Sequence, residues 1–90
     1  MSDTQHPSPR LSFIGCGHMG EALLQGSLRG GFTSADRTTV STHTPERAAL
    51  LGERYEVQVA PTNAVCARDS ELVVLAVKPD RYREVIREIL

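Results

Sequence analysis

The chain has 90 residues, 40% hydrophobic and 23% charged, with a formal net charge of −1 at pH 7. This composition is typical of one small globular domain and excludes a disordered chain. Acidic and basic residues are interspersed, which argues against a nucleic-acid partner, and no apolar run is long enough to cross a bilayer. Two cysteines are too few for a disulfide framework, so we expect a reduced, cytoplasmic protein.

The N-terminal third predicts a tail followed by a strand, a turn and a helix. Residues 1–10 are polar, contain two prolines and lack the apolar segment of a signal peptide, so we expect a flexible tail before a domain over residues 11–90. The apolar run at residues 11–14 predicts a buried strand. A helical pattern follows over residues 19–29 and ends at Gly30-Gly31.

Strands and helices alternate along the rest of the chain. We expect strands over residues 38–42, 56–59 and 72–77, and helices over residues 45–55, 63–67 and 82–90. Thr44 is the expected N-cap of the second helix, with Pro45 as its first residue, and Asn63 is the expected cap of the third. The run at residues 72–77 is continuously apolar, which is typical of a central strand covered on both faces.

The resulting order, βαβαβαβα, determines the expected fold class. Right-handed crossovers convert this alternation into an α/β fold with a Rossmann-like, doubly wound parallel sheet. The usual order of such a sheet predicts the strand order 3-2-1-4. The final helix reaches the last residue without a cap or a glycine, so we expect the domain to be truncated there.

The turn between the first strand and the first helix has the pattern G-x-G-x-x-G at residues 15–20. Gly15 allows the tight turn, Gly17 lets a pyrophosphate approach the backbone, and Gly20 lets the helix pack on the strand. The N–H groups and the dipole at the helix start favour phosphate. This context predicts a dinucleotide site, the alternative being a glycine-rich turn with no ligand.

The end of the second strand indicates which dinucleotide binds. A site for NAD expects an acidic residue there, about 20 residues after the glycines. Asp36 has this spacing but precedes the strand, whereas the segment 41–44 (Ser-Thr-His-Thr) contains no acid. Its hydroxyls and imidazole, with nearby Arg47, would accept a 2′-phosphate, so we predict NADP(H) in preference to NAD(H). Thr44 as a plain N-cap and Arg47 as a solvated helix residue are the alternatives.

No metal or catalytic residue is predicted. Cys16, His18 and His43 lack the number and spacing of zinc ligands. Cys16 is interpreted as a small residue between two glycines rather than a nucleophile. Lys78 follows the last strand, where lining a cofactor or facing solvent fits better than catalysis.

Four parts of the chain together resemble the N-terminal domain of the pyrroline-5-carboxylate reductase family over residues 11–90. They are FIGCGHMGEALLQG, TPERAALLGERYEV, Asn63 and LVVLAVKPDRYREVI. The glycine turn is shared with many dehydrogenases, and the AVKP ending of the last strand is more particular. The resemblance implies an NADPH-preferring oxidoreductase of proline biosynthesis, which transfers hydride to the C=N carbon of 1-pyrroline-5-carboxylate and yields L-proline.

The resemblance also implies which residues bind the cofactor. Residues along the pyrophosphate would be Ile14, Gly15, Cys16, Gly17, His18 and Met19, in addition to Gly20 of the turn. Thr42, His43 and Thr44 would surround the 2′-phosphate, and Asn63 would contact the adenosine side. Ala76, Val77, Lys78 and Pro79 would line the path toward the nicotinamide ribose.

The chain departs from the family pattern in two local positions and in length. His18 replaces the usual Asn or Gln, and Thr42-His43-Thr44 replaces Asn-Arg-Ser, so that Arg47 or a protonated His43 would substitute for the arginine. Family members continue into a helical domain that forms the homo-oligomer and carries the substrate site. We therefore expect this chain to bind cofactor and to catalyse nothing alone.

Three alternatives to this reading stay open. Two are other reductases with the same N-terminal domain, of the β-hydroxyacid dehydrogenase type or the F420-dependent NADP oxidoreductase type. AVKP argues against the first and the plain G-C-G turn weakly against the second. The third is a non-catalytic, nucleotide-sensing module.

Overall fold

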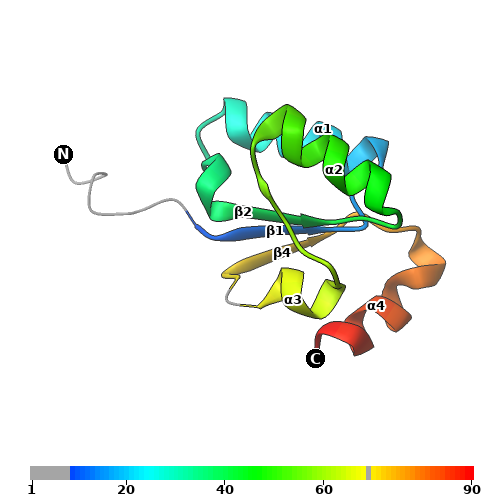
Figure 1. Ribbon diagram of the computed structural model, residues 1–90. Coiled ribbons are helices and arrows are strands. Elements are labelled where there is room, and N and C mark those ends of the chain that lie inside the picture. Colours follow the sequence, from blue (N-terminus) through cyan, green and yellow to red (C-terminus); the bar gives the residue numbers. More distant parts are fainter. Residues whose placement is uncertain (1–8, 69) are drawn as a thin grey trace.

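A computed structural model describes residues 9–68 and 70–90 of the chain (Figure 1). The strands are β1 (Leu11–Ile14), β2 (Thr38–Ser41), β3 (Gln58–Val59) and β4 (Leu72–Leu75). The helices are α1 (His18–Arg29), α2 (Pro45–Tyr55), α3 (Asn63–Ala67) and α4 (Tyr82–Ile89), with 3-10 turns η2 (Ala35–Arg37) and η3 (Pro79–Arg81). Apart from Pro9 and Arg10, the predicted tail lies outside the described residues.

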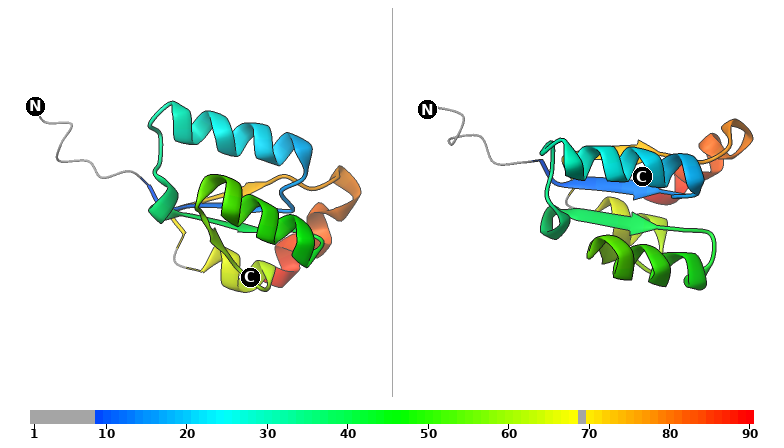
Figure 2. Two further views of the ribbon diagram at one scale, coloured as in Figure 1. Left: turned by 45° about the horizontal axis from the view of Figure 1, so that its top comes forward. Right: turned by 90° about the horizontal axis from the view of Figure 1, so that it is seen from above.

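The four strands form one parallel sheet in the order β3-β2-β1-β4. This is the Rossmann-like order predicted from the sequence, and it is confirmed. Helices α1 and α2 lie on one face of the sheet, and α3 and α4 lie on the other (Figures 1 and 2). Because every strand runs in the same direction, the segments that follow β1, β2 and β4 meet at one edge of the sheet.

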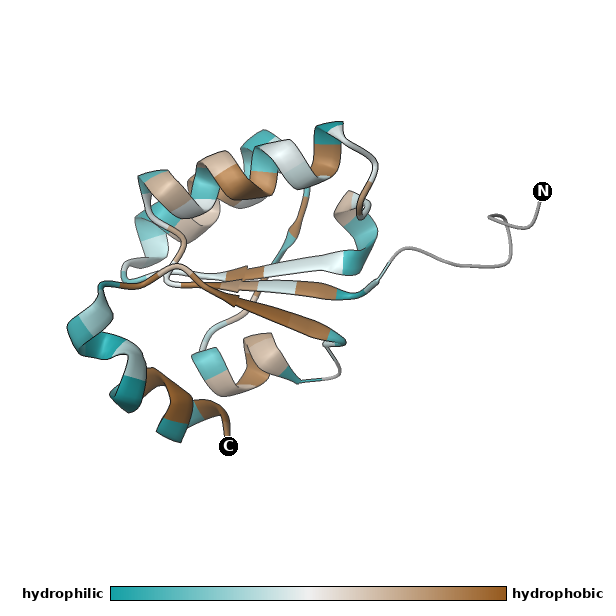
Figure 3. Cartoon of the chain, turned by 180° about the vertical axis from the view of Figure 1, so that it is seen from behind, coloured by the Kyte–Doolittle hydropathy of each residue, from teal (hydrophilic) through white to brown (hydrophobic). Residues whose placement is uncertain are grey.

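The strands divide the core into two clusters, one beneath each helix layer. The cluster under α1 and α2 contains Leu11, Phe13, Cys16, Leu24, Val40, Leu51 and Val57, and the cluster on the opposite face contains Ile14, Ala60, Cys66 and Val85. Figure 3 shows that β4 is hydrophobic along its length, whereas the helices carry both polar and apolar residues. Within the described ranges, no helix is long and apolar enough to cross a membrane.

The helix caps confirm one prediction and correct another. The Thr44 hydroxyl accepts the Arg47 backbone N–H, and Pro45 opens α2 as expected. Thr62, rather than Asn63, caps α3, because its hydroxyl accepts the Val65 N–H at 3.1 Å. Threonine and asparagine are both good caps, so the prediction that Asn63 fills this role was wrong by one residue.

The prediction that residues 72–77 form a central strand was wrong for the sheet of described residues, although side chains of β4 do pack against the core clusters on both faces. β4 ends at Leu75 and pairs with β1 alone, so it forms one edge of the sheet of described residues. Its side chains are half-buried, and Leu72 is 46% exposed. An apolar run predicts a strand, but it does not distinguish an edge strand from a central one.

Candidate cofactor site

Two glycines of the turn are required by the fold itself. Gly15 has a φ of +75°, and a Cβ on it would lie 2.1 Å from the Val77 Cγ1 atom. A Cβ on Gly20 would lie 2.9 Å from the Ala76 Cβ and 3.1 Å from the Cys16 Sγ. The predicted roles of Gly15 in the tight turn and of Gly20 in close helix–strand packing are therefore confirmed.

Gly17 differs from its two neighbours because the protein does not require a glycine there. Its φ is −85°, a value open to any residue, and it is exposed. The nearest atom to a Cβ built on it, outside its chain neighbours, is the Gly15 carbonyl oxygen at 4.0 Å. The glycine keeps open a space outside the protein, as a closely approaching pyrophosphate needs.

The start of α1 presents backbone donors next to this space. The N–H groups of Gly15 and Cys16 both donate to the Ser41 carbonyl, and that of Gly17 donates to the Gly15 carbonyl at 2.7 Å. The next N–H groups, from His18 onward, belong to the first turn of α1, which has no side-chain cap. Such groups lack intrahelical acceptors and lie at the positive end of the helix dipole, so they suit an anion.

Three hollows that share lining residues run along the carboxyl ends of the strands. The largest, about 500 Å³, is lined by Gly15, Gly17, Thr42, His43, Asn63, Ala76, Val77, Lys78, Asp80, Arg81 and Val85. A second, about 300 Å³, is lined by Gly15, Cys16, Gly17, His18, Thr42, His43, Thr44 and Arg47. A third, about 340 Å³, lies beside Ser41, Thr42, Pro61, Thr62, Asn63, Ala64 and Glu88. The predicted segments after β1, β2 and β4 thus meet at one groove.

Four of the predicted residues lie outside the linings of these hollows. The Ile14 side chain is fully buried in the core, and its carbonyl accepts the Ala76 N–H at 2.8 Å. Gly20 packs on Ala76, while Met19 and Pro79 are exposed next to the lining. Ile14 and Gly20 shape the groove from behind, and contact of these four residues with a cofactor stays a prediction.

The second hollow has a cationic lining. It lies between the glycine turn and residues 42–44, and its described lining residues include Arg47 and no carboxylate. The Arg47 guanidinium lies against the turn, since its Nε donates to the Cys16 carbonyl at 3.3 Å. The Thr42 hydroxyl donates to the Thr44 carbonyl at 2.6 Å, which braces the segment after β2. A negatively charged group is favoured in this hollow.

Glu21 connects the two helices beside this hollow. Its carboxylate accepts from Tyr55 Oη at 2.6 Å, from Arg54 Nη1 at 2.5 Å and from Arg47 Nη2 at 2.6 Å. The Tyr55 hydroxyl foremost, and then the two arginines, lower the pKa of Glu21 from 4.5 to about 2. The carboxylate is therefore ionised at neutral pH and joins α1 to both ends of α2.

Glu21→Gln should lower the stability of the chain at neutral pH and much less in acid. Because folding depresses the pKa of Glu21, its contribution is complete above about pH 4.5 and is lost as pH falls toward about 2. We expect the variant to lose about 2 kcal/mol of unfolding free energy at pH 7, as for a hydrogen-bonded charged group. Urea denaturation from pH 7 to pH 2.5 measures the difference, and a loss of the same size at every pH would contradict this prediction.

Asn63 connects three elements behind the third hollow. The Ser41 hydroxyl donates to its Oδ1 at 2.7 Å, and its Nδ2 donates to Glu88 Oε1 at 2.6 Å. The amide therefore joins β2 to α4. Asn63 was predicted from the sequence, but two other lining residues were missed, Glu88 of the third hollow and Arg81 of the first. Their positions depend on how α4 folds back onto the sheet. The available signal for Arg81 was a cation in the segment that follows the last strand.

Cys16 was considered as a possible nucleophile and Lys78 as a possible catalytic group. Burial raises the pKa of the Cys16 thiol to about 11, which keeps it neutral. Burial also raises the pKa of Cys66. Lys78 is exposed and lines the first of the three groove hollows, of about 500 Å³. Among residues 9–68 and 70–90, no group of three or more His, Cys, Asp or Glu side chains is arranged to hold a metal ion.

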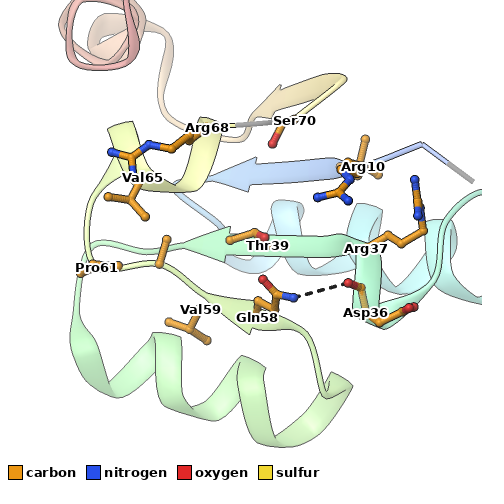
Figure 4. Close-up of a pocket in the computed structure, with 12 residues that line it drawn as sticks. Arg10, Asp36, Arg37, Thr39, Gln58, Val59, Pro61, Val65, Arg68 and Ser70 are labelled. Atoms are coloured by element: carbon orange, nitrogen blue, oxygen red, sulfur yellow. Dashed lines mark hydrogen bonds between the residues drawn. The ribbon is translucent and has the colours of Figure 1, made fainter.

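Asp36, the acid with the spacing of an NAD-binding residue, lies away from the groove. It belongs to η2, which precedes β2, and it lines a hollow of about 290 Å³ with Arg10 and Ser70, which precede β1 and β4 (Figure 4). Its carbonyl accepts from Gln58 Nε2 at 3.4 Å. Asp36 lies at the amino ends of the strands, whereas the glycine turn lies at their carboxyl ends. The position of Asp36 therefore agrees with its exclusion from the predicted cofactor site.

Comparison with known proteins identifies the family. The family model described as "NADP oxidoreductase coenzyme F420-dependent" matches residues 10–90. The chain belongs to this family. The chain is also similar to curated reductases: it is 31% identical over 80 residues to the pyrroline-5-carboxylate reductase of Methanosarcina acetivorans, covering 89% of this chain and 30% of that protein.

Two solved structures resemble this NADP oxidoreductase family member. A pyrroline-5-carboxylate reductase from Coxiella burnetii superposes with a TM-score of 0.83 at 27% identity, covering 91% of this chain and 30% of that one. Pyrroline carboxylate reductase from Plasmodium falciparum, solved with NADP bound, superposes with a TM-score of 0.73 at 25% identity, covering 90% and 28%. The chain thus spans about 30% of the curated relatives it matches.

Proposed function

We propose that this chain is the NADP(H)-binding domain of a pyrroline-5-carboxylate reductase. The observation that carries the proposal is the hollow between the glycine turn and residues 42–44, whose described lining has Arg47 and no carboxylate. A 2′-phosphate is favoured by such a lining and repelled by the acid typical of NAD sites. Similarity to reductases that include an NADP-bound structure supports the same assignment.

Each part of the groove has a proposed role toward the cofactor. The backbone at Gly15, Gly17 and the start of α1 holds the pyrophosphate. Thr42, His43, Thr44 and Arg47 hold the 2′-phosphate, and Asn63 contacts the adenosine side. Ala76, Val77 and Lys78 lead toward the nicotinamide ribose. When bound, the cofactor supplies hydride, and these residues supply its placement.

The 90-residue chain should bind NADPH more tightly than NADH. The two cofactors share every group except the 2′-phosphate. The difference between their affinities therefore measures how strongly the second hollow binds that phosphate. Charge-assisted hydrogen bonds to this phosphate predict a preference of about tenfold or more. Titration calorimetry at one fixed salt concentration measures both affinities, and equal affinities or a preference for NADH would overturn the assignment of residues 42–47.

The reaction is proposed at the level of the whole enzyme. Reduction of the C=N bond of 1-pyrroline-5-carboxylate, cytoplasmic location and assembly of a homo-oligomer are carried over from the resemblance to the reductases. No catalytic residue is assigned within this chain. NADPH oxidation with pyrroline-5-carboxylate, assayed with the protein at the full length its gene encodes, tests the activity, and no turnover would overturn it.

A second reaction is favoured by the description of the matching family model. In an F420-dependent oxidoreductase the same groove would hold NADP while a deazaflavin coenzyme exchanges hydride with it. The curated relatives support the imine substrate instead. Oxidation of reduced F420 by NADP, in the absence of pyrroline-5-carboxylate, would identify this alternative.

A further inference from the structure

The cation of the second hollow is held by a residue outside that hollow. Arg47 Nε donates to the Cys16 carbonyl at 3.3 Å, and Arg47 Nη2 donates to Glu21 Oε1 at 2.6 Å. These atoms form one edge of the planar guanidinium. Among the described residues, the hydrogen bonds of the Arg47 side chain all come from this edge. The Nη1 group makes none of them and stays available to a ligand.

Glu21 is itself fixed before any ligand arrives. Its second carboxylate oxygen accepts from Arg54 Nη1 and from Tyr55 Oη, both at the far end of α2. The Glu21 side chain is 14% exposed and that of Arg47 is 21% exposed. A long arginine side chain ordinarily loses rotamer freedom on binding a phosphate, and this anchoring removes part of that loss in advance.

We infer that Glu21 is a positioning residue that orients Arg47 and thereby sets the preference for a 2′-phosphorylated nucleotide. The inference rests on the proposed function, because it takes the hollow beside Arg47 as the 2′-phosphate site. Glu21 does not line that hollow. The two arginines that share its single carboxylate leave the cluster with a net positive charge.

Positioning can be separated from simple electrostatics because the two effects have opposite signs. A carboxylate near an anion site weakens anion binding through its charge, so its neutralisation should strengthen binding of the 2′-phosphate. If Glu21 orients Arg47, neutralisation should weaken that binding, because a guanidinium recognises phosphate through its fixed fork of donors.

The test compares adenosine 2′,5′-diphosphate with 5′-AMP as ligands of the 90-residue chain. The dissociation constant of 5′-AMP divided by that of adenosine 2′,5′-diphosphate isolates the contribution of the 2′-phosphate to affinity. We expect Glu21→Gln to reduce this ratio by about tenfold, the effect of one hydrogen bond to a charged group. Glu53→Gln is the matched control, since it removes the same charge from an exposed position on α2, and it should leave the ratio unchanged. An unchanged or increased ratio in Glu21→Gln would overturn the inference.

Arg47→Met separates this inference from the proposed function. If Arg47→Met leaves the ratio unchanged, the proposed phosphate site fails and the inference fails with it. If Arg47→Met reduces the ratio and Glu21→Gln does not, the site stands and the positioning role of Glu21 is wrong.

Arg47→Lys provides a test should Glu21→Gln fail to fold, as circular dichroism would show. A lysine keeps the charge but has no planar fork that contacts Cys16 and Glu21 together. It should therefore lose most of the ratio, and full retention of the ratio would contradict the inference.

Discussion

Replacing Gly17 by valine should abolish nucleotide binding while the chain stays folded. The φ of −85° suits valine, and outside its chain neighbours a Cβ would meet no atom closer than the Gly15 carbonyl oxygen at 4.0 Å. The added side chain would occupy the space left for the pyrophosphate, with an expected loss of affinity of about 100-fold or more from several broken charge-assisted hydrogen bonds. Calorimetric titration with NADPH measures the affinity, and an unfolding free energy from urea denaturation within about 1 kcal/mol of the wild type would show the retained fold.

Gly26→Val is the matched control for this experiment. Gly26 lies in α1, is exposed, and also has open space around a Cβ, but it is two helical turns from the groove. This variant should bind NADPH as the wild type does. Unchanged binding by Gly17→Val would show that the turn has a structural role only.

Gly15→Ala should produce the largest loss of stability among substitutions in the turn. A residue other than glycine at a φ of +75° costs about 1–2 kcal/mol, and the clash with Val77 adds about 1–3 kcal/mol of overpacking. The expected total, about 3 kcal/mol, is a large share of the stability of so small a domain. Urea denaturation of the variant and the wild type measures it.

The double variant Gly15→Ala/Val77→Ala separates the two causes. Val77→Ala removes the Cγ1 atom that lies 2.1 Å from the added Cβ, but it does not change the backbone φ at residue 15. We expect the double variant to be more stable than the sum of the single effects by about 1–2 kcal/mol. If the losses of unfolding free energy in the two single variants simply add in the double variant, the clash with Val77 is relieved in another way. Backbone strain at residue 15 would then account for the whole loss in Gly15→Ala.

Local patterns were sufficient to predict the fold and the conformation of the glycine turn. Strand order followed from the usual order of a Rossmann-like sheet, and the roles of Gly15 and Gly20 followed from the geometry of any tight strand–turn–helix unit. Thr44 and Pro45 were predictable as the start of α2, since each acts within one helical turn. These features depend on residues close together in the chain.

Apart from the one-residue error in the cap of α3, where the Thr62 hydroxyl accepts a nearby backbone N–H, the features that were missed depend on residues distant in the sequence. Thr62 caps α3, which leaves the Asn63 amide to bind Ser41 and Glu88, 22 and 25 residues away. The contact between Arg47 and Glu21 spans 26 residues and depends on how α1 packs beside α2. No periodicity or motif contains this information, because side chains from separate elements meet only after the sheet has formed.

The edge position of β4 has a consequence for how this chain behaves in solution. Its outer backbone groups have no partner strand among the described residues, and its four apolar side chains are only half covered. A bare apolar edge of this kind is a template onto which another chain can add a strand. Self-association should therefore rise with protein concentration, and affinities for nucleotides are best measured in dilute samples that light scattering shows to be monomeric.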